Sequence, residues 1–256
     1  MKLKPIQEKC ITLKLTGFFQ GLQLQELRTD SHELPFLERV SELLDVQLAE
    51  VECRRRKSLK RQANLRWANA HLSDIDLKSE QAIKPAVLKQ LSTCDWIRYC
   101  QHAILEGPTG GGKTHFACAL ANEAINQGLS VRFYRYAELV LMLKSADSEG
   151  ELDKLNRKLA RIDLIVIDDW GIKALDAVSR HLLFEFIEYR DQKGSLLITS
   201  QYPVDKWHAA FQDPTVADSV LDRIVHCSHK IKLTFGSHRK RKGLRVSETQ
   251  KSGGAS

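Results

Sequence analysis

The feature that most constrains this chain is the glycine-rich stretch 107–114, which follows a short apolar run and opens a helical pattern. A strand, a glycine-rich loop and a helix in this order can bind phosphate, because glycines let backbone N–H groups approach an anion at the start of the helix. Lys113 can then reach the β- and γ-phosphates, and the Thr114 hydroxyl can bind Mg²⁺. A chance glycine turn is the alternative. The expected cradle comprises Gly107, Pro108, Thr109, Gly110, Gly111, Gly112, Lys113 and Thr114.

A second apolar run, 164–167, ends in two carboxylates, Asp168 and Asp169. This pattern is typical of a central parallel strand that delivers acidic side chains to its carboxyl end. In a chain that alternates strands and helices, it predicts that Asp168 holds Mg²⁺, mostly through water. Asp169 is then expected to orient or activate the attacking water. The alternative is a buried strand that ends in a polar turn.

A further apolar strand is predicted over residues 195–201, and it also ends in polar residues. A polar side chain at this edge can contact the γ-phosphate and position water. Gln201 is the preferred candidate for this role, with Thr199 and Ser200 as alternatives.

The basic residues are clustered in a chain whose formal net charge is +7. An amphipathic helix starting at Pro35, with an apolar face that includes Leu37, Leu44 and Leu48, is predicted to run into the stretch 54–66. Cations on several faces of a helix are not expected to be neutralised by salt bridges between residues four apart, which favours contact with a nucleic-acid backbone. The alternative is a solvated face, or one paired with acids elsewhere in the fold. The cations are Arg54, Arg55, Arg56, Lys57, Lys60, Arg61 and Arg66.

Cysteine spacing and hydropathy argue against a metal-binding cysteine site, a membrane protein and a secreted protein. The six cysteines show no metal-binding spacing, so we expect reduced thiols in a cytosolic protein, with Cys118 in the core. No apolar run approaches the roughly 20 residues that a membrane span needs, and no signal peptide is expected at the start of the chain.

Several stretches together resemble the AAA+ ATPases. The resemblance is closest to the IstB-type transposition helper ATPases of bacterial insertion sequences, which are relatives of the helicase loader DnaC. The stretches that carry it are 107–115, 167–171, 198–204, 207–208, 213–215, 217–218, 221–224 and 236–240.

This resemblance implies an enzyme that binds ATP and Mg²⁺ and hydrolyses ATP. It further implies homo-oligomers on duplex DNA, largely independent of sequence, and a partner transposase that is helped to engage target DNA in the bacterial cytoplasm. His115 would join the nucleotide-binding residues, and Arg223 would act on the γ-phosphate of a neighbouring subunit. The alternative for Arg223 is a surface salt bridge with Asp218 or Asp222.

The expected fold class is α/β, an AAA+ P-loop NTPase core with a parallel five-stranded sheet flanked by helices. A small helical domain for DNA binding or oligomerisation is predicted over residues 1–75, the ATPase domain over 76–243, and a disordered tail over 244–256. Because 33 residues follow Arg223, little or no lid domain is expected. A second basic cluster lies at 239–242, where its role is left open because the glutamate that precedes it in the family is missing.

Two other functions fit the same residues. One is a helicase loader of the DnaC kind, whose core would be almost the same. The other is a non-enzymatic DNA-binding protein whose fold is locked by a nucleotide. One local feature departs from the usual pattern: Glu106 precedes the loop where an apolar residue is common, and its charge would be unfavourable near phosphates unless the side chain points away.

Overall fold

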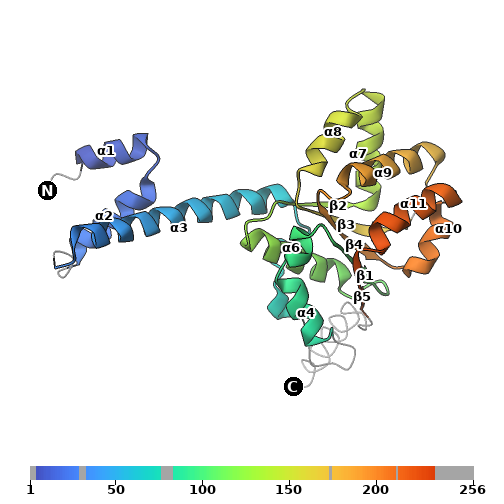
Figure 1. Cartoon of the computed structure of the whole chain (residues 1–256), viewed down its shortest axis with the longest axis horizontal. Helices are drawn as coiled ribbons and strands as arrows, with labels where there is room; N and C mark the ends of the chain where they lie inside the picture. Colours follow the sequence, from blue (N-terminus) through green and yellow to red (C-terminus); the bar gives the residue numbers. More distant parts are fainter. Residues whose placement is uncertain (1–3, 29–32, 76–82, 173–174, 212, 234–256) are drawn as a thin grey trace, which may run out of the picture. The chain divides into compact units, whose positions relative to one another are not determined.

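The computed structural model describes residues 4–28, 33–75, 83–172, 175–211 and 213–233. The chain forms two compact units, Met1–Leu59 and Lys60–Ser256 (Figure 1). The division falls earlier than the boundary expected near residue 75, so Lys60, Arg61 and Arg66 of the basic run belong to the second unit. The predicted tail and the basic cluster 239–242 lie outside the described residues.

The first unit is helical, as predicted. It contains α1 (Lys4–Thr12), α2 (Thr16–Leu27) and most of α3 (Phe36–Ala63). Gly17 and Gly21 lie within α2, where they let α2 and α3 approach closely. A Cβ atom at Gly17 would lie 2.8 Å from the carbonyl oxygen of Val46, and one at Gly21 would lie 2.9 Å from the Leu43 side chain. The glycines are therefore packing residues rather than helix breakers.

The apolar face predicted for α3 does not pack against α2. Leu43 and Gln47 are buried there, and the Gln47 side chain accepts a hydrogen bond from the Phe18 N–H at 3.0 Å. Leu37 and Leu48, which belong to the predicted face, are 77% and 61% exposed. The helical period was predicted correctly, but the tertiary contact uses the neighbouring face of the helix.

The second unit is built on a five-stranded parallel sheet in the order β2-β3-β4-β1-β5. This confirms the predicted sheet. In a parallel sheet of this kind the carboxyl ends of the strands share one edge, and ligands bind outside that edge. The strands are β1 (His102–Glu106), β2 (Val131–Arg135), β3 (Leu164–Trp170), β4 (Ser195–Ser200) and β5 (Ser228–Lys232).

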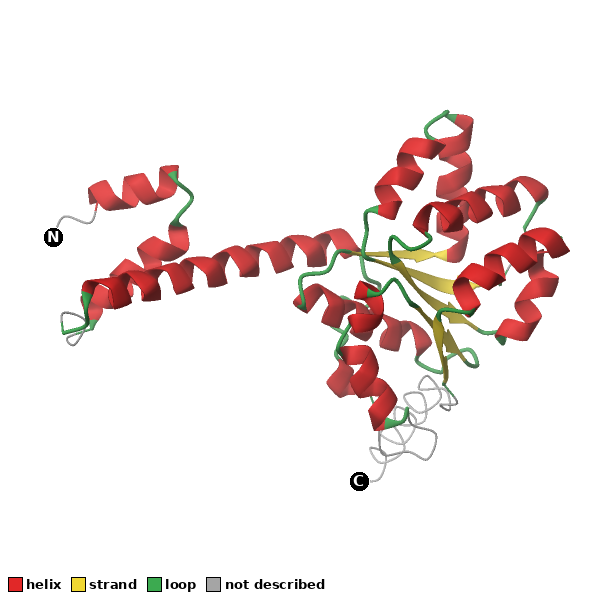
Figure 2. Ribbon diagram, viewed as in Figure 1, coloured by secondary structure: helices red, strands yellow, loops and turns green. Residues whose placement is uncertain are grey.

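Helices cover both faces of this sheet (Figure 2). On one face, α6 (Lys113–Asn126) packs against β1, β3 and β4. Figure 1 shows α7, α9 and α11 on the opposite face. The helices besides α6 are α4 (Pro85–Ser92), α5 (Asp95–Arg98), α7 (Tyr136–Ser148), α8 (Leu152–Ala160), α9 (Ala177–Arg190), α10 (Trp207–Phe211) and α11 (Pro214–Val225), with short 3₁₀ turns at Leu72–Asp74 and Val204–Lys206.

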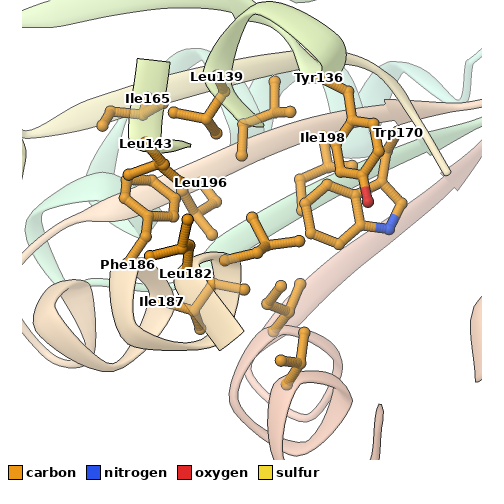
Figure 3. Packing of buried hydrophobic residues seen from close by; sticks show 14 of the residues in the cluster. Tyr136, Leu139, Leu143, Ile165, Trp170, Leu182, Phe186, Ile187, Leu196 and Ile198 are labelled. Carbon is orange, nitrogen blue, oxygen red and sulfur yellow. The ribbon is translucent and has the colours of Figure 1, made fainter. Parts of the chain in front are cut away.

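The core on the α7–α11 face is formed by alternate residues of the strands. Ile165 from β3 and Leu196 and Ile198 from β4 pack there against α7 and α9 (Figure 3). At the carboxyl end of β3, the Trp170 ring lies 5.0 Å from the Tyr136 ring and 5.4 Å from the Trp207 ring, measured between centroids. This aromatic group fixes the end of the strand that carries the two predicted catalytic carboxylates.

Within the described residues, no helix combines the length and the apolar character that crossing a membrane requires.

Candidate active site

The glycine-rich loop joins β1 to the amino end of α6, as predicted. Gly107 has φ +157°, and a Cβ atom there would lie 2.2 Å from the carbonyl oxygen of Leu233. Gly110 and Gly112 have φ +81° and +77°, and Gly112 is the residue directly before α6. Side chains are disfavoured in these conformations, so the path of the loop depends on glycine. The resulting turn exposes backbone N–H groups at a helix start, which suits an anion.

Lys113, the first residue of α6, lies inside this loop. It is 6% exposed, and its ammonium group donates hydrogen bonds to the carbonyl oxygens of Gly107 at 2.7 Å and Pro108 at 2.8 Å. Burial lowers the pKa of Lys113, and the negative charges of Asp169 and Asp168 act in the opposite direction. The loop therefore surrounds a buried cation that can turn from carbonyl oxygens to phosphate oxygens.

Asp168 is fully buried and is held by two hydroxyl groups. The Thr114 hydroxyl lies 2.9 and 3.1 Å from its two carboxylate oxygens, and the Thr199 hydroxyl donates to Oδ1 at 2.6 Å. Burial raises the pKa of Asp168, whereas the hydrogen bonds from Thr199 and Thr114 oppose that rise. A carboxylate beside a hydroxyl group, at the edge of a phosphate-binding loop, is the hard-oxygen donor set that Mg²⁺ prefers. These residues thus fit the predicted metal site.

Asp169 adopts a backbone conformation that is unusual for a residue with a side chain. Its φ is +63°, and the pairing of β3 with β4 shifts between Ile167 and Trp170, as in a β-bulge. The Asp169 N–H donates to the Thr199 hydroxyl at 3.0 Å. Such backbone strain costs about 1–3 kcal/mol and occurs often at functional sites. The bulge turns Asp169 away from the direction that strand alternation would give it.

The three polar candidates at the end of β4 have different surroundings. The Ser200 hydroxyl is occupied, because it donates to the Trp170 carbonyl at 3.2 Å and accepts from the Trp207 indole at 3.1 Å. Thr199 contacts Asp168 and the backbone of Asp169, a double role that the sequence signalled only as a polar strand end. Gln201 lies beside the loop, where its side-chain oxygen accepts from the Thr109 hydroxyl at 2.7 Å.

Glu106 points away from the glycine-rich loop. Its carboxylate accepts a hydrogen bond from the Val204 N–H at 3.1 Å, in the turn that follows β4. The unfavourable charge expected beside the loop is therefore directed toward a backbone donor.

Arg223 on α11 pairs with a residue that we did not predict. Its guanidinium lies 2.5 Å from the Glu188 carboxylate, donates to the Ser219 carbonyl at 2.9 Å and sits over the Phe184 ring. The proposed partners Asp218 and Asp222 were wrong, since their carboxylates contact His208 and His226. The described contacts of Arg223 are with α9 and α11, so it does not join the cluster at the glycine-rich loop of its own chain.

The basic run lies on α3 up to Arg61, and all of its members are exposed. Two of them are paired with acids one turn earlier: Arg54 lies 2.6 Å from Glu50, and Arg56 lies 4.0 Å from Glu52. These two pairs form because the acids precede the run rather than interrupt it, and they leave most of its positive charge without a local i,i+4 salt bridge among the described contacts. Lys60 also donates to the Asn69 side chain at 3.2 Å.

Arg66 follows α3 and lies close to the candidate active site. Its guanidinium lies 3.8 Å from Oδ2 of Asp168. Its spacing in the sequence groups it with the proposed DNA contacts. No local pattern indicates that this residue reaches a carboxylate more than a hundred positions later in the chain.

Comparisons with known proteins identify the family of this chain. The model of the family described as IstB-like ATP binding protein matches residues 9–246. An insertion-sequence ATP-binding protein of Sinorhizobium fredii, y4pL, is 35% identical over 94% of this chain and 98% of its own length. The ATP-binding protein of insertion sequence IS1162 of Pseudomonas fluorescens is 38% identical over 75% of this chain and 83% of its own.

Among solved structures, the DnaC helicase loader superposes with a TM-score of 0.54 at 19% identity. The match covers 66% of this chain and 99% of that one, and it shows that the second unit has the α/β fold predicted from the sequence. The match of the family model and the identity to the two relatives show that the chain belongs to the family of IstB-like ATP binding proteins.

Proposed function

We propose that this protein is an ATP-hydrolysing regulator that assembles on duplex DNA and helps a transposase engage target DNA. The observation that carries this proposal is the buried network in which Thr114, Asp168 and Thr199 meet beside the glycine-rich loop. Buried polar groups joined by hydrogen bonds form a rigid site. In this network the oxygen atoms of Thr114 and Asp168 are positioned to bind a metal ion that also contacts phosphate.

The triphosphate of ATP binds in the glycine-rich loop, where backbone N–H groups and the Lys113 ammonium surround its oxygens. Thr114 and Asp168 hold Mg²⁺, which supplies positive charge next to the phosphates when it is bound. The remaining contacts of the cradle come from residues 107–112 and from His115, which follows Thr114 on α6.

Asp169 orients and activates the attacking water. Its bulged backbone aims the carboxylate, and the Thr199 hydroxyl fixes both Asp168 and the Asp169 N–H. Gln201 senses the γ-phosphate from the end of β4, since it already contacts Thr109 of the loop. The described residues of the chain itself thus supply a metal site and a water-positioning group. The cations found there among the described residues are Lys113 in the loop and Arg66 beside Asp168, so a further cation for the charge that develops on the transferred phosphoryl group comes from outside the chain.

A neighbouring subunit supplies that cation through Arg223. On its own chain Arg223 is held at α9 by Glu188, away from the glycine-rich loop. An arginine that completes the site across an interface makes hydrolysis depend on assembly. Oligomerisation is also supported by the exposed apolar side chains Leu37 and Leu48 on α3, which are unusual on a surface that stays free.

Replacing Lys113 with alanine tests nucleotide binding, the first step of the proposed function. We expect the affinity for Mg²⁺·ATP to fall about a hundredfold, because a buried ammonium contributes charge-assisted hydrogen bonds to the phosphates. Isothermal titration calorimetry measures the change, and Lys154→Ala on α8 is the control because Lys154 is exposed and pairs only with Glu151 in the described structure. Equal affinity in Lys113→Ala and the wild type would contradict the assignment of the loop.

The basic run on α3 binds the DNA backbone. Neutralising phosphates releases counterions, so the logarithm of the affinity falls with the logarithm of the salt concentration. The residues proposed for this contact are Arg54, Arg55, Arg56, Lys57, Lys60 and Arg61. Arg66 stays a weaker candidate, because its guanidinium lies beside Asp168.

A triple variant, Arg55→Gln, Arg56→Gln and Lys57→Gln, tests this contact without touching the Arg54–Glu50 pair. We expect the slope of log affinity against log salt to become shallower by about 2–3, as for the loss of three phosphate contacts. Fluorescence anisotropy with a duplex of mixed sequence measures it. The matched control removes three exposed cations of the second unit: Lys154→Gln, Lys158→Gln and Arg161→Gln. If both triples change the slope equally, the contact is not specific to α3.

The transposase partner is proposed from the relatives, which are named after insertion sequences. The likeness to the DnaC helicase loader keeps a second function open, in which a replicative helicase is the partner. Pull-down with each purified partner separates the two: retention of a transposase from the same element supports the first, and retention of a helicase alone supports the second. We further propose that residues 1–75 bind DNA and mediate oligomerisation, that 76–243 form the ATPase, and that the protein works in the bacterial cytoplasm.

A further inference from the structure

The stretch of chain that follows α3 lies along one face of α6, the helix that begins at the glycine-rich loop. The Asn122 side chain donates to the carbonyl oxygens of Ala68 at 3.2 Å and Ala70 at 2.9 Å. Nearer the loop, the Trp67 ring lies 6.0 Å from the His115 ring in an edge-on arrangement. His115 and Asn122 are seven residues apart on α6, so they share one face of the helix. We call residues 64–75 the α6 strap.

The α6 strap carries a cation to the metal-binding carboxylate. Arg66 is 37% exposed in its side chain, whereas Asp168 is fully buried, so the guanidinium reaches the site from the solvent side. The carboxylate oxygen that Arg66 approaches, Oδ2, is also 3.1 Å from the Thr114 hydroxyl. Arg66 therefore lies next to the two groups that are proposed to hold Mg²⁺.

We propose that Arg66 is a positioning residue that competes with Mg²⁺ for Asp168, so that binding of the Mg²⁺·nucleotide releases the α6 strap from the active site. This proposal rests on the proposed nucleotide site. A divalent cation and a guanidinium repel each other at short range, and Mg²⁺ demands nearer and more regular oxygen contacts than a guanidinium 3.8 Å away. The two cations thus favour different positions of the strap.

Release of the α6 strap would affect the basic run, because the strap is covalently continuous with α3. The helix α3 ends at Ala63, so that only Asn64 and Leu65 separate its last residue from Arg66. Asn64 has φ +51°, which marks the sharp change of direction at the start of the strap. Release of Arg66 would change the constraint at the end of the helix that carries the DNA-binding cations. Arg66 then serves as a link between nucleotide state and α3.

Arg66→Gln in the full-length protein tests this competition. Binding of a fluorescent ATP analogue is followed without DNA while Mg²⁺ is titrated. We expect the Mg²⁺ midpoint to fall about three- to fivefold in Arg66→Gln, the effect of removing a partly exposed ion pair, and the difference to shrink at high salt. The control Arg61→Gln makes the same change of charge on α3 and is expected to keep the wild-type midpoint.

Three outcomes would overturn the proposal. An unchanged or higher midpoint in Arg66→Gln would show that the guanidinium does not compete with Mg²⁺. If Arg66→Gln binds the analogue more weakly than the wild type in excess EDTA, Arg66 is a phosphate ligand. Wild-type protein that binds no analogue at any Mg²⁺ concentration would overturn both this inference and the proposed function, whereas the first two results leave the proposed function intact.

Hydrogen exchange supplies a readout that does not depend on activity. We expect Mg²⁺ with ADP to speed amide exchange in residues 64–75 of the wild type, compared with ADP in EDTA. Arg66→Gln is expected to show the faster exchange already in EDTA, since its strap lacks the contact with Asp168. Identical exchange of the strap under both conditions in the wild type would contradict its release.

Discussion

Replacing Asp169 with asparagine is expected to lower the turnover number for ATP about a thousandfold, the usual effect of removing a general base. Asparagine keeps the size and the hydrogen-bonding shape of the side chain but cannot accept a proton from water. Asparagine also tolerates positive φ better than most residues, so the φ of +63° at this position should persist. Nucleotide affinity should change less than about twofold, because Asp169 acts after binding.

Phosphate release in the presence of DNA measures turnover, and calorimetry measures binding of Mg²⁺·ATP. Asp147→Asn on α7 is the control, because Asp147 is an exposed carboxylate outside the described active site. Thermal unfolding is compared in parallel, since Asp169→Ala would add backbone strain that Asp169→Asn avoids. Wild-type turnover in Asp169→Asn would show that another group activates the water.

Arg223→Ala is expected to lower DNA-stimulated turnover by a factor of about a thousand or more, as for the loss of an arginine that stabilises the transferring phosphoryl group. Binding of Mg²⁺·ATP should stay close to that of the wild type, because Arg223 contacts Glu188 and Ser219 rather than the glycine-rich loop of its own chain. Stability should change little. The ion pair is partly solvent-exposed, and such pairs contribute about 0–1 kcal/mol.

The structure offers a matched control for this variant. Glu188→Gln breaks the same ion pair but leaves the guanidinium free to act on a neighbour. We expect Glu188→Gln to keep most of the DNA-stimulated turnover. Equal losses in the two variants would assign Arg223 a structural role, exerted through its ion pair with Glu188 of α9.

The glycine-rich loop and the strand ends could be predicted from the sequence because their signals are local. A loop between β1 and α6 needs glycine where its backbone takes positive φ, as at Gly107 and Gly112. The carboxylates after an apolar strand must appear at the carboxyl edge of a parallel sheet. These features do not depend on knowing which distant residues come together.

The contacts that tune the site could not be predicted in the same way. Whether Thr199 or Gln201 would contact Asp168 depends on the register between β3 and β4, which the bulge shifts by one residue. The approach of Arg66 to Asp168 depends on how the α6 strap crosses α6. Charge and spacing placed Arg66 in the basic run, but tertiary packing gave it a different neighbour.

In the first unit, too, the tertiary contact could not be predicted from a local pattern, here the helical period of α3. It identified the apolar residues that include Leu37 and Leu48, but it could not say which face packs against α2. Close approach at Gly17 and Gly21 selects the face of Leu43. The apolar side chains left exposed then become candidates for contacts between subunits.

The central claim is that each active site is completed by a neighbouring subunit, and mixing two inactive variants tests it most directly. Lys113→Ala keeps Arg223 but binds nucleotide about a hundredfold more weakly. Arg223→Ala binds nucleotide but cannot complete its neighbour's site. Each protein alone, with DNA and Mg²⁺·ATP, should show almost no phosphate release. An equimolar mixture should recover a substantial part of the wild-type rate, because some interfaces then pair an intact loop with an intact arginine. A mixture as inactive as its components, although both variants assemble together on DNA, would contradict the account.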